Sequence, residues 1–141
     1  MRNIEHFIGG QSVAGTSGKH GDVFDPNKGI VQARVSLASA EELDRAVANA
    51  AEAQEGWAQA NPQRRARVMF EFKRLLEVHM DELAHLLSSE HGKVIADSKG
   101  DIQRGLEVIE FACGIPHLLK GEYTQGAGPG IDVYSARQAL G

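Results

Sequence analysis

Apolar and polar residues alternate in the first part of the chain. From Ile30 to Leu37, apolar residues recur at every second position, with polar residues at Gln32, Arg34 and Ser36. This period of two predicts a strand with one solvated face. A shorter strand is predicted at residues 22–24, ended by the turn-forming residues 25–29. The N-terminal part is therefore expected to consist of short antiparallel strands.

A hairpin is predicted still closer to the N-terminus. Residues 6–8 and 11–13 flank Gly9 and Gly10, and two consecutive glycines are a typical two-residue hairpin turn. The small and polar residues 14–21 that follow predict a loop.

The period then changes to that of a helix. Ser39 and Glu42 have the spacing of a capping box, in which each side chain binds the other residue's backbone N–H. Behind this cap, apolar residues fall on one helical stripe formed by Leu43, Val47, Ala50 and Trp57. Pro62 is suited to the first turn of a second helix.

The strongest amphipathic run of the chain lies between residues 68 and 87. A break near His79–Met80, with Asp81 as a fresh N-cap, divides it into two helices, and Gly92 is expected to end the second in a left-handed conformation. A further helix is predicted from Ser98 to Leu119, ended or bent by Pro116.

Residues 121–130 are rich in glycine and predict a plain connector. Residues 131–137 alternate and predict a final strand with no partner nearby in the sequence. Such an unpaired edge invites another polypeptide, so we expect something else to cover it. The predicted class is α/β, with three to four amphipathic helices.

Composition excludes several classes of function. The net charge of −4 and the pI of about 5.8 do not favour nucleic acid as a partner. No stretch approaches the ~20 apolar residues of a membrane span, and no leader pattern is present, so a cytoplasmic protein is expected. The single cysteine, Cys113, suits a reducing compartment.

Few residues carry candidate chemistry. No metal site is expected, because the histidines at positions 79, 85 and 91 turn about 240° around a helix at each step. Cys113 lies among apolar residues and is expected to pack in the core, not to act as a nucleophile. Arg104, next to a glycine, suits recognition of a carboxylate, but its spacing alone favours a surface ion pair with Asp101 or Glu107.

Several segments, in order, resemble the opening of the aldehyde dehydrogenase superfamily. They are residues 7–10, Asp25-Pro26, the strand-cap-helix block from Ala33 to Ala46, residues 90–93 and residues 104–112. The last block continues through residues 114–121 and is similar to the methylmalonate-semialdehyde dehydrogenase branch, which acylates coenzyme A. Each of these segments alone is a weak signal, whereas their order along almost the whole chain is specific to this superfamily.

The resemblance implies a domain organisation. Residues 1–120 would be the N-terminal part of an NAD-binding domain, and residues 121–141 a linker with the first strand of the oligomerisation arm. The catalytic domain, the nucleophilic cysteine and the NAD-binding glycine motif would lie outside this stretch. The final strand would then pair with the rest of the enzyme or with a sister subunit.

The resemblance also implies an activity. The parent enzyme would oxidise methylmalonate or malonate semialdehyde with NAD and form propionyl-CoA or acetyl-CoA, as in valine or inositol catabolism. Arg104 would hold the acidic semialdehyde, and these residues alone would be inactive. The family pattern Arg-x-Pro-Leu-Gly is altered here, because Ala139 replaces the proline.

Two other hypotheses remain open from the sequence. The chain could be a stand-alone interaction or regulatory module without catalysis, acting through strand pairing. It could also belong to another aldehyde dehydrogenase subclass, for which Arg104 would not bind an acidic substrate.

Overall fold

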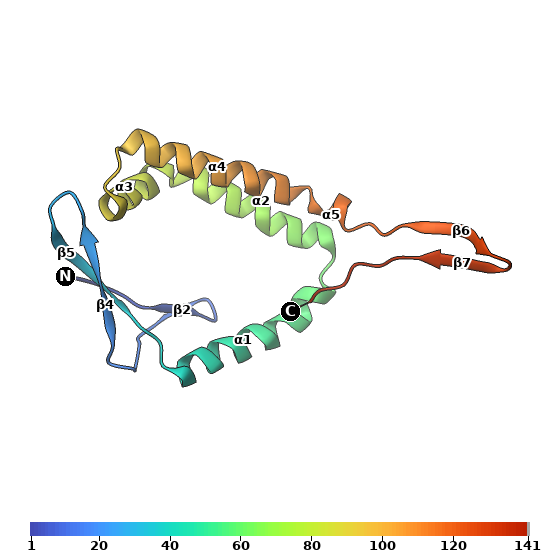
Figure 1. Ribbon diagram of the computed structural model, residues 1–141, viewed down its shortest axis with the longest axis horizontal. Coiled ribbons are helices and arrows are strands. Elements are labelled where there is room, and N and C mark those ends of the chain that lie inside the picture. Colours follow the sequence, from blue (N-terminus) through green and yellow to red (C-terminus); the bar gives the residue numbers. More distant parts are fainter. Residues whose placement is uncertain (141) are drawn as a thin grey trace.

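The computed structural model describes residues 1–140, which form short sheets and five helices. The elements in chain order are β1 (Arg2–Ile4), β2 (His6–Ile8), β3 (Gln11–Val13), β4 (His20–Asp25), β5 (Ile30–Ser36), α1 (Ala40–Gln59), α2 (Pro62–Val78), α3 (Met80–His91), α4 (Ile95–Cys113), α5 (Ile115–Leu118), β6 (Tyr123–Gly128) and β7 (Ile131–Tyr134). Figure 1 shows an open arrangement, with the N-terminal strands at one end and the β6–β7 hairpin projecting from the other. The predicted α/β class is confirmed.

The N-terminal strands form two separate sheets. Strand β5 lies in the centre of one, parallel to β1 and antiparallel to β4, and its Ala33 is almost fully buried. The β2–β3 hairpin is the other, as predicted from Gly9 and Gly10. Both glycines have positive φ, 61° and 78°, a backbone conformation that glycine adopts without steric cost.

The start of α1 holds the preceding loop in place. Ser39 Oγ accepts from the Glu42 N–H at 3.2 Å, and Glu42 Oε2 accepts from the Ser39 N–H at 2.8 Å, so the predicted capping box is confirmed. Glu42 does more than the sequence predicted. Its Oε1 also accepts from the N–H and hydroxyl of Thr16, at 2.6 and 3.0 Å. This carboxylate therefore joins the loop after β3 to the first turn of α1.

The Glu42 carboxylate makes the stability of the fold depend on pH. The N–H groups of Ser39 and Thr16 lower the pKa of this nearly buried carboxyl from 4.5 to about 2. Because the folded pKa lies below the ordinary value, the stabilisation is complete above pH 4.5 and is lost as the pH falls towards 2. We expect Glu42→Gln to lower the unfolding temperature at pH 7 and to flatten its dependence on pH between 4.5 and 2, measured by thermal unfolding across that range.

The matched control is Glu52→Gln on the same helix. Glu52 is exposed and makes no side-chain hydrogen bond within residues 1–140, so this substitution should leave the pH profile unchanged. Equal effects of the two substitutions would contradict the role assigned to Glu42.

The helices begin and end largely where the sequence predicts, except at the start of α3 and at both ends of α4. The break between α2 and α3 lies at His79, as predicted, and Gly92 ends α3 with φ of 88°. Asp81 is not the N-cap, however. The His79 carbonyl already accepts from the Leu83 N–H, so α3 begins earlier, and Asp81 instead forms an ion pair with Lys99 at 2.5 Å.

The boundaries of α4 also differ from the prediction. The helix begins at Ile95, not at Ser98, because Ser98 is an interior position that is fully buried against α3. Its hydroxyl lies 2.7 Å from that of Ser88. The helix ends at Cys113, and Pro116 lies in the first turn of the separate helix α5, where its missing N–H breaks no hydrogen bond.

The prediction of a connector and a lone final strand was wrong. Residues 123–128 form strand β6, which pairs antiparallel with β7, so that Tyr123 lies opposite Tyr134. The glycines mark turn conformations, with φ of 65° at Gly126 and 70° at Gly130. The sequence signal was misread because glycine and small residues hide the strand pattern of β6. Gly141, the last position of the predicted arm region, lies outside the described residues.

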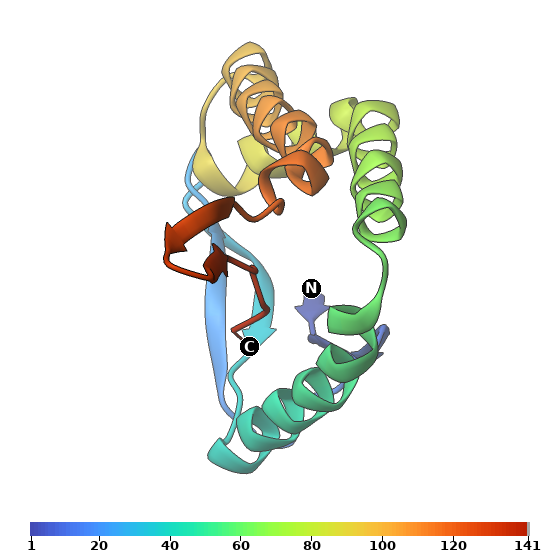
Figure 2. The same cartoon turned by 90° about the vertical axis from the view of Figure 1, so that its right-hand side faces the viewer.

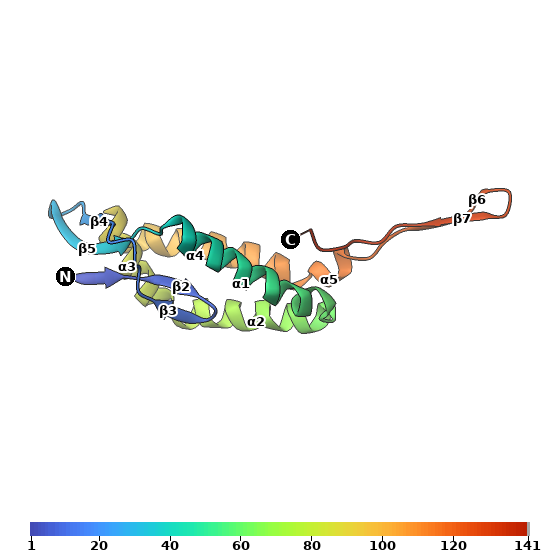
Figure 3. The ribbon, with the colours of Figure 1, turned by 90° about the horizontal axis from the view of Figure 1, so that it is seen from below.

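Little of the described chain is buried. The buried apolar residues within residues 1–140 are mostly small, namely Ala33, Ala66, Ala84, Leu106 and Cys113. The predicted apolar stripe of α1 is present but uncovered, with Leu43, Val47 and Trp57 between 48% and 60% exposed. Figures 1 and 2 show α1 lying apart from the α3–α4 pair, and Figure 3 shows the hairpin extending as a thin arm. The helices thus present apolar faces that residues 1–140 do not cover.

Candidate functional site

Arg104, the substrate-contact candidate from the sequence, lies in the middle of α4. Its side chain is 78% exposed, and its Nη1 donates to Asp101 Oδ1 at 3.0 Å. This is the local ion pair expected from the i, i+3 spacing. The alternative partner, Glu107, forms no ion pair with it among the described residues.

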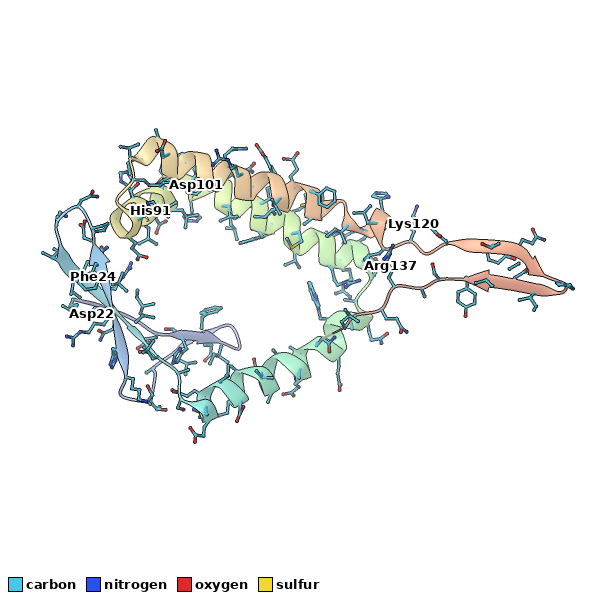
Figure 4. All side chains as sticks on the ribbon, in the orientation of Figure 1. Asp22, Phe24, His91, Asp101, Lys120 and Arg137 are labelled. Carbon is cyan, nitrogen blue, oxygen red and sulfur yellow. The ribbon has the colours of Figure 1, made fainter. Side chains whose placement is uncertain are left out.

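Asp101 also binds a second cation that the sequence did not indicate. Lys93, from the three-residue segment between α3 and α4, donates its ammonium to Asp101 Oδ2. The Lys93 side chain is only 20% exposed. The hydrogen bond from Lys93, and then the charges of Lys93, Arg104 and His91, hold the pKa of Asp101 below its usual range despite partial burial. Figure 4 places Asp101 and His91 at the same end of the helical layer.

These three residues, Lys93, Asp101 and Arg104, form what we call the α4 charge cluster. Its two cations and one anion sum to one positive charge. A guanidinium carries five N–H donors, and within residues 1–140 Arg104 uses Nη1 alone for a side-chain hydrogen bond. The cluster can therefore bind a carboxylate or another small anion through Arg104.

Cys113, the candidate thiol, lies apart from this cluster. Cys113 is a free thiol, buried at the end of α4, which agrees with the predicted packing role. Of the three histidines at six-residue spacing, His79 pairs with Glu82 at 3.0 Å. In the part of the chain that the structure describes, no three potential metal ligands converge, and no helix is long and apolar enough to span a membrane.

The glycine-rich residues do not form a nucleotide loop. A phosphate loop needs its glycines directly before the N-terminus of a helix, whereas residues 126–130 lie in and after β6 and lead into β7. Residues 126–130 thus do not fit the pyrophosphate of a dinucleotide.

Residues 13–141 match the aldehyde dehydrogenase family, and the chain belongs to this family. The predicted family resemblance is confirmed. No comparison supports the alternative of a stand-alone interaction module.

The more specific similarity is to semialdehyde dehydrogenases. The chain is 58% identical, with a TM-score of 0.97, to a Sinorhizobium meliloti 1021 protein that was assigned as a methylmalonate-semialdehyde dehydrogenase and crystallised with NAD. The match covers all of this chain and 29% of that protein. It is 44% identical, with a TM-score of 0.93, to the methylmalonate-semialdehyde dehydrogenase of Oceanimonas doudoroffii, covering 98% and 28%.

A curated relative gives the same result. Malonate-semialdehyde dehydrogenase 2 of Geobacillus thermodenitrificans is 46% identical over 140 residues, which are 99% of this chain and 29% of the relative. The chain therefore spans less than a third of the length of these relatives and matches their fold from end to end of its own sequence.

Proposed function

We propose that these residues act as the N-terminal part of an NAD-dependent dehydrogenase for methylmalonate or malonate semialdehyde, working in the cytoplasm. The observation that carries the proposal is the match over the whole chain to the Sinorhizobium meliloti protein, at 58% identity and a TM-score of 0.97. A shared backbone at that identity favours a shared substrate class over a distant subclass.

The proposed domain organisation follows the family resemblance. Residues 1–120 would belong to the NAD-binding domain, and the uncovered apolar faces of their helices support contact with further polypeptide. Residues 121–141 would form the oligomerisation arm, because the β6–β7 hairpin is exposed along nearly its whole length. This arm would pair with sister subunits in a homo-oligomer by strand addition.

The chain's own contribution to the reaction would be substrate binding. We propose that Arg104 binds the carboxylate of the semialdehyde through its free N–H groups, because a planar guanidinium matches a carboxylate in two parallel hydrogen bonds. NAD, when bound, accepts the hydride. The acyl group would then pass to coenzyme A with loss of the substrate carboxylate as carbon dioxide, giving propionyl-CoA or acetyl-CoA. The thiolate that attacks the aldehyde would come from outside these residues, since Cys113 is buried.

Activity assays test this proposal directly. We expect residues 1–141, purified alone, to reduce no NAD in the presence of malonate semialdehyde and coenzyme A, followed by absorbance at 340 nm. A dehydrogenase of the full length of the relatives that carries this stretch should do so, and Cys113→Ser in that longer protein should retain turnover. NAD reduction by the short chain, or loss of turnover confined to the chemical step in Cys113→Ser, would contradict the proposal.

A further inference from the structure

We propose that Lys93 and Asp101 are positioning residues for Arg104. Asp101 orients the guanidinium, and Lys93 offsets the charge of Asp101 so that Arg104 still attracts an anionic substrate. This inference rests on the proposed function, in which Arg104 binds the carboxylate of a semialdehyde.

The geometry assigns one oxygen of Asp101 to each cation. Oδ1 accepts from Arg104 at 3.0 Å, and Oδ2 accepts from Lys93. With both oxygens bound, the carboxylate is fixed in rotation, and so is the direction in which it holds the guanidinium. Lys93 belongs to the segment before α4, so the cluster also ties that segment to the helix.

The charges explain why a lysine is needed. Asp101 alone would cancel the charge of Arg104 and compete with a substrate carboxylate for the same N–H groups. Lys93 restores a net charge of one positive unit. The three side chains are graded in exposure, with Lys93 at 20%, Asp101 at 41% and Arg104 at 78%. The compensating charge is thus placed on the inner side, and the guanidinium remains the outermost group.

A purely structural role is the competing explanation. In that case the Lys93–Asp101 bond would only hold the α3–α4 junction, and its loss would affect every substrate equally. The two explanations differ in their dependence on substrate charge, which can be measured with malonate semialdehyde and with propanal, a neutral aldehyde that also has three carbons.

The experiment uses the full-length dehydrogenase that carries these residues. Lys93→Met keeps the apolar stem but removes the charge, and we expect it to raise KM for malonate semialdehyde about three- to tenfold, the range for a neighbouring charge partly screened by water. KM for propanal should change less than about twofold. Lys93→Arg should behave like the unchanged enzyme. All assays share one pH, because His91 also lies near Asp101.

The double variant Lys93→Met with Asp101→Asn provides the rescue test. It removes one positive and one negative charge and returns the cluster to a net charge of one, and the amide oxygen introduced at position 101 can still accept from Arg104, so KM for the acidic substrate should recover most of its loss. A misfolded junction would not recover in this way. Equal increases of KM for both aldehydes, or no recovery in the double variant, would overturn the inference.

Arg104→Leu separates this inference from the proposed function. We expect it to raise KM for malonate semialdehyde roughly 10- to 100-fold, as for the loss of hydrogen bonds to a charged group. If Arg104→Leu has this effect and Lys93→Met has none, the positioning role alone fails. If Arg104→Leu leaves KM unchanged, the substrate contact fails, and the positioning role fails with it.

Discussion

Replacement of Gly121 by alanine will open the base of the β6–β7 hairpin. A Cβ atom at this position would overlap the backbone oxygen of Ser135, because real Cβ contacts stay beyond 3.0 Å. The blocking atom belongs to the backbone, so no change of rotamer relieves the clash. Two hydrogen bonds between Glu122 and Ser135, both of 2.9 Å, hold the same point together and would break. The expected loss exceeds about 3 kcal/mol of local stability.

Hydrogen exchange measures this effect. The backbone amide of Ser135 should exchange at least about 100-fold faster in Gly121→Ala, as its hydrogen bond to the Glu122 carbonyl is lost. The control is Gly128→Ala in the same hairpin, where the nearest atom to a new Cβ is a side-chain carbon of Ile131 at 3.5 Å, an ordinary contact. Unchanged protection at Ser135 in Gly121→Ala would show that the two chain segments do not meet as described.

The second large effect is expected at the contact between α3 and α4. Ser98 is fully buried, and its hydroxyl is paired with that of Ser88 at 2.7 Å. Ser98→Leu inserts additional carbon atoms where Ala84 is also fully buried, and it leaves the Ser88 hydroxyl without this partner. Overpacking and an unpaired buried hydroxyl each cost about 1–3 kcal/mol, so we expect a total loss of roughly 3–5 kcal/mol.

Thermal unfolding and soluble yield test this prediction. Ser98→Ala removes only the hydrogen bond and should cost about 1–2 kcal/mol. Ala96→Leu places the same leucine at an exposed position of α4 and should be nearly neutral. If Ser98→Leu destabilises the protein no more than Ser98→Ala, helices α3 and α4 can separate without a loss of stability.

The presence of the helices and some of their ends could be predicted from the sequence because those signals are local. The capping box of Ser39 and Glu42, the glycine at position 92 and the hairpin turn at Gly9-Gly10 each act within a few residues. The structure places all of them as expected. The contact from Glu42 to Thr16 was missed because its partners are 26 residues apart and no periodicity links them.

The candidate site was predictable in part. The pairing of Arg104 with Asp101 follows from helical spacing, but Lys93 lies on the other side of a helix boundary, where no spacing rule applies. Strand β6 was missed because glycine and alanine occupy positions where a strand usually carries branched residues. In both places the decisive information was the path of the chain in three dimensions.

The uncovered stripe on α1 has a consequence for biosynthesis. In a polypeptide of which these residues are the first 29%, as in the relatives, the ribosome would deliver them well before the remainder. At about 5–20 residues per second, the remainder would take on the order of tens of seconds. During that interval Leu43, Val47 and Trp57 would face water. Nascent chains of such a polypeptide should therefore depend on a chaperone that shields apolar helices until translation is complete.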